Sequence, residues 1–69
     1  MLMHQPTDDE RIIWHGGNST QLHYECLINN EWKPLETQTL MEFPHGVKEF
    51  KQAMVEFYNY CSPIYCKKS

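Results

Sequence analysis

The hydrophobic pattern is most regular in residues 47–61, VKEFKQAMVEFYNYC, where apolar side chains recur at helical spacing. At 3.6 residues per turn, one stripe collects the side chains of Val47, Phe50, Ala53, Met54, Phe57, Tyr58 and Cys61. Gly46 is an acceptable N-cap, and Pro63 disfavours helical geometry at Ser62. The pattern therefore predicts an amphipathic helix whose apolar stripe must be covered by the rest of the chain.

The segment before this helix has the alternation and the turn residues of a small antiparallel sheet. Residues 11–15, RIIWH, are rich in strand formers and are followed by the turn sequence GGNS. Residues 21–28, QLHYECLI, alternate between apolar and polar positions. Asn29 and Asn30 tolerate positive φ, which predicts a two-residue hairpin turn into a third strand that ends near residues 40–41.

The predicted hairpin turn also predicts a strand register. It places Tyr24 opposite Leu35 and Leu22 opposite Thr37 on the apolar face. The polar side chains expected together on the outer face are Glu25, Glu36, His23 and Gln38.

One residue of the third strand disagrees with this assignment of faces. Trp32 falls on the outer face beside Leu27. Pro34 has no backbone N–H to donate, which indicates an edge strand or a bulge. A bulge at Lys33 and Pro34 would turn Trp32 inward.

These elements predict an α+β protein, with a three-stranded antiparallel β-meander followed by one C-terminal helix packed on its apolar face. Residues 1–10 are polar and lack periodicity, so we expect a flexible N-terminal arm. Residues 11–66 form a single small α+β domain, and residues 67–69 are expected to be a mobile tail.

Charge and composition disfavour a nucleic-acid-binding protein and a membrane-spanning protein. Nine acidic residues against six scattered basic ones give a net charge of −3, which disfavours nucleic acid as a partner. The sequence has neither the start of a signal peptide nor an apolar run near the roughly 20 residues that span a bilayer. We therefore expect a cytoplasmic protein without a membrane span, in which the three cysteines are thiols.

The residues that zinc or nucleophilic chemistry would need are poorly arranged. Cys61 and Cys66 have a spacing compatible with zinc, but the four histidines have no short spacing of their own. Cys26 and His23 are an odd number of residues apart, so a strand sends them to opposite faces. We expect no enzyme, no metal site and no cofactor, in a chain too short for a deep cleft.

Two Trp, three Phe and four Tyr are more aromatic surface than one short helix can cover. Exposed aromatic residues typically anchor protein–protein contacts. The sequence thus predicts a small acidic interaction module, an adaptor or inhibitor, that binds a protein partner or itself as a homodimer through the sheet edge. The residues predicted to make these contacts are Trp32, Leu27, Trp14, Tyr60, Glu25 and Glu36.

The sequence is also compatible with functions other than a protein-interaction module, and it leaves the origin of the protein open. Small single-domain inhibitors are common in phages and mobile elements, and such an origin is compatible with the sequence. The β-β-β-α order is similar in topology to sheet-type DNA readers such as integrase arm-binding domains, which implies a nucleic-acid-binding regulator. Besides the interaction module and the nucleic-acid-binding regulator, the remaining hypothesis is a zinc- or redox-responsive switch through Cys61 and Cys66.

Overall fold

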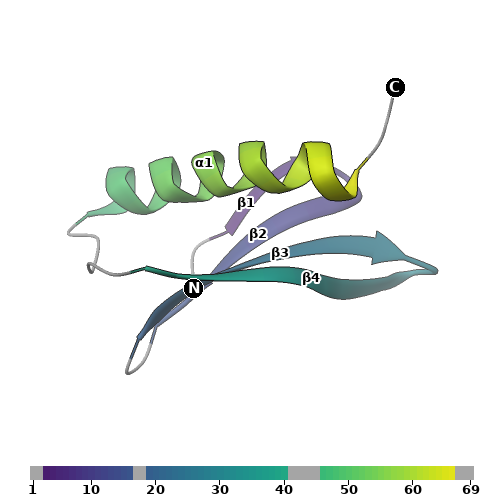
Figure 1. Cartoon of the computed structure of the whole chain (residues 1–69), viewed down its shortest axis with the longest axis horizontal. Helices are drawn as coiled ribbons and strands as arrows, with labels where there is room; N and C mark the ends of the chain where they lie inside the picture. Colours follow the sequence, from purple (N-terminus) through teal and green to yellow (C-terminus); the bar gives the residue numbers. More distant parts are fainter. Residues whose placement is uncertain (1–2, 17–18, 41–45, 67–69) are drawn as a thin grey trace.

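The structure is a computed structural model that describes residues 3–16, 19–40 and 46–66 of the chain. Within these residues, one helix lies across one face of a four-stranded antiparallel sheet of order β1-β2-β3-β4 (Figure 1). The predicted α+β class and C-terminal helix are confirmed. The prediction of three strands is wrong, because the sheet has a fourth. The predicted mobile tail, residues 67–69, lies outside the described residues.

The additional strand is β1 (Met3–Thr7), within the segment for which a flexible arm was predicted. It pairs antiparallel with β2 (Glu10–His15), and His4 lies opposite Ile12. The sequence of β1, MHQPT, has no apolar alternation because none of its side chains is fully buried. Backbone groups along the outer edge of β2 supply its hydrogen-bond partners, and this tertiary pairing outweighs a weak local preference.

The centre of the sheet is the pairing of β2 with β3 (Thr20–Ile28), in which Ile12 lies opposite Tyr24 and Trp14 opposite Leu22. Alternation directs these side chains to the face beneath the helix. Ile12, Leu22 and Tyr24 are completely buried there.

The turn at Asn29 and Asn30 connects β3 to β4 (Glu31–Leu40). Both turn residues have positive φ, 53° and 65°, as a type I′ turn requires. The predicted two-residue hairpin turn is therefore confirmed.

Beyond this turn the β3–β4 ladder contains a bulge at Leu35. Glu25 pairs with Pro34, whereas Tyr24 pairs with Glu36, so Leu35 is an extra residue. The predicted pairing of Tyr24 with Leu35 is wrong by one residue. Because a shift of one residue exchanges the two faces, Glu36 lies on the helix side of the sheet and not on the outer face as predicted.

The helix α1 (Val47–Tyr65) begins at the predicted residue, with extended backbone at its N-cap, Gly46. Its first backbone bond runs from Phe50 N to Gly46 O at 3.1 Å. The predicted apolar stripe faces the sheet, except that Val47 is exposed. Among the described residues, the buried apolar ones are Ile12, Ile13, Leu22, Tyr24, Phe50, Met54, Phe57 and Cys61. No helix in the described ranges is both long and apolar enough to cross a membrane.

The end of α1 differs from the prediction, because Pro63 lies inside the last turn rather than terminating the helix before it. The cost is limited, since near a C-terminus proline removes only one late backbone bond. Two contacts of Ser62 hold this turn. Its Oγ donates to Glu10 Oε2 at 2.9 Å, and its carbonyl accepts from Cys66 N at 2.8 Å.

Candidate functional site

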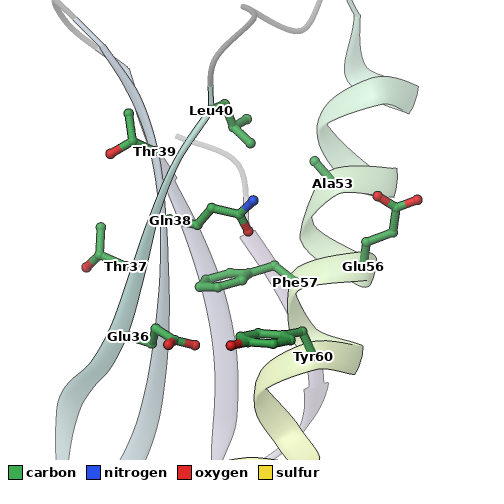
Figure 2. Close-up of a pocket in the computed structure, with 9 residues that line it drawn as sticks. All are labelled: Glu36, Thr37, Gln38, Thr39, Leu40, Ala53, Glu56, Phe57 and Tyr60. Carbon is green, nitrogen blue, oxygen red and sulfur yellow. The ribbon is translucent and has the colours of Figure 1, made fainter.

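A groove of about 620 Å³ lies between α1 and β4. In Figure 2, Glu36, Gln38 and Leu40 point from β4 toward the helix. Phe57 and Tyr60 point from the helix toward β4, while Thr37 and Thr39 point away from the groove. The full lining is Glu36, Thr37, Gln38, Thr39, Leu40, Ala53, Glu56, Phe57 and Tyr60.

The groove has an apolar base and an exposed aromatic rim. Phe57 is 3% exposed, whereas Tyr60, one turn further along the helix, is 58% exposed. An exposed tyrosine beside buried apolar surface can contact a ligand with its ring and its hydroxyl. The groove is therefore a surface that can bind a side chain from another molecule.

One wall of the groove is an edge strand. In the described part of the chain no strand pairs with the outer side of β4. Residues 31–35 of this edge contain Lys33, Pro34 and the bulge, features that hinder pairing with another chain. Residues 36–40, ETQTL, have no proline and include two threonines, which favour strand pairing. The half of β4 that borders the groove is thus the half open to a further strand.

The groove exists because α1 lies toward the other side of the sheet. The helix contacts β2 most and β4 least. Tyr58 and Ser62 of α1 donate hydrogen bonds to Glu10 of β2, at 3.2 and 2.9 Å. These bonds hold the helix over β1 and β2, and they leave the β4 side uncovered.

Glu10 is itself a buried carboxylate, 2% exposed, and it accepts four hydroxyl bonds. Besides the two from the helix, Tyr24 donates at 2.5 Å and Thr7 at 3.0 Å. Burial raises the pKa of Glu10, but the four bonds together lower it below its ordinary value of 4.5. Burial and the neighbouring Cys26 and Glu10 raise the pKa of Tyr24, so its phenol remains a donor.

A buried thiol lies beside the acidic wall of the groove. Cys61 Sγ donates to Glu36 Oε2 at 3.0 Å. Burial, and then the adjacent carboxylate, raise the pKa of Cys61 well above its ordinary value of 9.0. Burial and the hydrogen bond to Glu36 thus favour the neutral thiol of Cys61, which packs in the core and acts as a donor.

The residues predicted to contact a partner are divided among three places. Glu36 and Tyr60 line the groove. Trp32 and Leu27 pair across β3 and β4 on the face opposite the helix, and Glu25 shares that face. The bulge at Leu35 lies beyond Trp32, so Trp32 keeps its outward direction.

Trp14, also predicted as a contact residue, lies on the helix side of the sheet. Its ring packs on Phe50 with centroids 4.3 Å apart. Its indole N–H is buried without a hydrogen-bond partner among the described residues. We therefore do not include Trp14 in the candidate site.

The outer face carries a compact cluster around Arg11. Its guanidinium bonds Glu25 at 2.7 Å, and its Cζ lies 4.2 Å from the ring centroid of Trp32. Glu25 neutralises the charge of Arg11, and Trp32 covers its guanidinium. A nucleic-acid-binding protein would need such a basic group free to contact phosphates on this face.

Metal-ligating side chains do not gather in the described ranges. No group of three or more His, Cys, Asp or Glu residues lies there in an arrangement that could hold a metal ion. His15 and His23 contact one another with ring centroids 4.8 Å apart, and His23 Nδ1 lies 3.0 Å from Thr37 Oγ1.

Sequence reasoning missed Glu10 and most of the groove. Glu10 is in phase with Ile12 and Trp14, so extending the alternation of the first strand backwards would have placed it inward. The acidic run that contains it looked like a solvated arm. The groove had no comparable signal, because it depends on which strands the helix covers.

The comparisons with known proteins found no match to this chain. No protein-family model matches the chain, and no curated protein or solved structure shows significant similarity to it.

Proposed function

We propose that this protein is a small non-enzymatic interaction module, an adaptor or inhibitor, that binds an extended segment of a partner protein along the β4 edge. The observation that carries the proposal is the juxtaposition of residues 36–40, an edge without a paired strand in the described chain, with the groove beside Tyr60. An added strand bonds its backbone to such an edge and inserts alternate side chains into the adjacent groove.

The proposed occupant is a different protein and not a second copy of the chain. Pairing two β4 edges would bring the acidic groove residues Glu36 and Glu56 of each copy together. Like charges at close range oppose association, and β4 of a second copy would itself insert Glu36. The other sheet edge, β1, is only five residues long and contains Pro6, so it is less suited to adding a strand.

The test begins with selection of peptides from a random decapeptide display library on the immobilised protein. Selected peptides are then titrated into the ¹⁵N-labelled protein. We expect the amide shifts to concentrate at Thr37, Thr39 and Leu40. Tyr60→Ala should weaken binding by about tenfold or more, the typical effect of removing an aromatic anchor. The control is Val55→Ala, a partly exposed residue of the same helix that does not line the groove.

Two results would overturn the proposal. One is the absence of any selected peptide that shifts the β4 amides. The other is a dimer in sedimentation velocity that Tyr60→Ala converts to a monomer, because that would make a second copy the occupant of the groove.

A further inference from the structure

We infer that the segment recognised by the groove is basic, with a lysine or arginine side chain lying over Tyr60 and reaching the carboxylate of Glu36. This inference rests on the proposed function, since it names the partner chemistry of the same groove.

The charge of the groove is one-sided. Its described lining contains two carboxylates, one on each wall, and neither lysine nor arginine. Glu36 belongs to β4 and Glu56 to α1. In Figure 2 the Glu36 carboxylate is directed toward the helix, whereas the Glu56 carboxylate is directed away from β4. A cationic side chain inserted between the walls would therefore meet the charge of Glu36 directly, and Glu56 would add negative charge at the rim of the groove.

These two carboxylates are not neutralised within the described part of the chain. Glu36 accepts from the Cys61 thiol at 3.0 Å, and Glu56 accepts from the Gln52 amide at 3.4 Å. Both donors are uncharged. Neither glutamate has an ion pair with a described residue, in contrast to Glu25, which pairs with Arg11 at 2.7 Å. The negative charge of the groove is thus available to a partner.

The apolar part of the groove matches the rest of a basic side chain. Lysine and arginine bury their methylene stems on apolar surface while the charged head remains polar or solvated. Phe57 and Tyr60 provide that surface, and a cation over a tyrosine ring is attracted by the ring itself. A glutamate or aspartate in the same position would lose this attraction and meet like charge.

The far end of the groove has a different character. Leu40 and Ala53 line it, four residues along β4 from Glu36. Alternate residues of an added strand face the same side, about 6.7 Å apart. The expected recognition pattern is therefore a basic residue with an apolar residue two or four positions away.

The test uses the decapeptides selected on the wild-type protein. We expect lysine or arginine to be enriched at one position, with an apolar residue two or four positions away. For a synthetic peptide of this kind, Glu36→Gln/Glu56→Gln should weaken binding at low salt by about tenfold or more. Raising the salt should reduce wild-type binding more than binding by the double variant.

The matched control is Asp8→Asn/Glu31→Gln, which removes the same number of charges at exposed positions outside the groove. It should leave binding within about twofold. If Glu36→Gln perturbs the fold through Cys61, as judged by the amide spectrum, the question is decided on the peptide instead. Replacing its basic residue by glutamine should then weaken binding to the wild-type protein by about tenfold or more.

The outcomes separate the inference from the function on which it rests. Selected peptides without basic residues, or binding that Tyr60→Ala weakens but the glutamate variants do not, would refute the basic partner and leave the module intact. Peptides that shift amides near Trp32 rather than those of residues 36–40 would refute both.

Discussion

Replacement of Glu10 by glutamine should remove a large part of the stability of this domain. The amide keeps one acceptor oxygen but presents a donor where the second oxygen was. Oε2 accepts from Tyr24 and Ser62, and Oε1 from Thr7 and Tyr58. One of these hydroxyl pairs must therefore turn or lose its acceptor, and all four bonds lose the charge of the carboxylate.

The magnitude follows from the burial of the four donors. Hydrogen bonds to a charged group contribute about 1.5–3 kcal/mol, against about 1 kcal/mol for neutral pairs. Tyr24 is completely buried, so its bond should weaken by about 1–2 kcal/mol. The other three donors are partly exposed, and about 0.5 kcal/mol each is a discounted value. The sum is about 2.5–3.5 kcal/mol, a large fraction of the few kcal/mol that a domain of this size has.

Urea unfolding followed by circular dichroism measures this loss. With a slope of about 1 kcal/mol per molar urea, the midpoint should fall by about 2.5–3.5 M at pH 7. The matched control is Glu31→Gln, the same change at an exposed position of β4, which should stay within about 0.5 kcal/mol. A midpoint for Glu10→Gln equal to that of the control would refute the structural role assigned to the hydroxyl cluster.

The same variant predicts a pH dependence. Because the pKa of Glu10 is lower in the folded protein than its ordinary 4.5, its ionised form stabilises the fold above that value. The stabilisation is lost as the pH falls through the folded pKa. The stability difference between wild type and Glu10→Gln should therefore shrink below about pH 4.5. A difference that grows on acidification would contradict the direction of the pKa shift.

Three further substitutions and one labelling reaction test the core, the turn and the thiols. Tyr24→Phe, which removes the shortest bond to the buried carboxylate, should cost about 2 kcal/mol in urea unfolding; a cost below 0.5 kcal/mol, on the order of an exposed substitution, would contradict it. Met54→Ala should cost about 2–4 kcal/mol, because the side chain is 1% exposed; a smaller loss would mean that the helix does not pack as described. Asn30→Ala places alanine at φ 65° and should cost about 1 kcal/mol, whereas Asn30→Gly should cost nothing. In thiol labelling followed by peptide mass spectrometry, Cys61 should react more slowly than Cys66, and faster labelling of Cys61 would refute its burial.

The helix and the central strand could be read from the sequence because each has a strong period of its own. The stripe through Phe50, Met54 and Phe57 repeats at helical spacing over four turns, and Leu22 and Tyr24 alternate as strand residues do. Such patterns arise when one face of an element is buried, whichever partner buries it.

The first strand and the end of the helix could not be read in this way. The sequence of β1 is polar, and it becomes a strand because β2 has backbone groups to pair with. The last turn of α1 contains Pro63 and persists alongside the bond from Ser62 to Glu10. In both cases a partner distant in the sequence outweighs the local preference.

The candidate site likewise has features that the sequence predicted and features that depend on the tertiary structure. The sequence by itself predicted more aromatic surface than one short helix can cover, and it indicated Tyr60 and Glu36 among the residues expected to contact a partner. Only the tertiary structure decided where they meet, through one extra residue. The bulge at Leu35 turns Glu36 from the outer face to the helix side, because a shift of one residue in a strand with a two-residue period exchanges its faces. The position of the helix over β1 and β2 then leaves the space between β4 and Tyr60 uncovered.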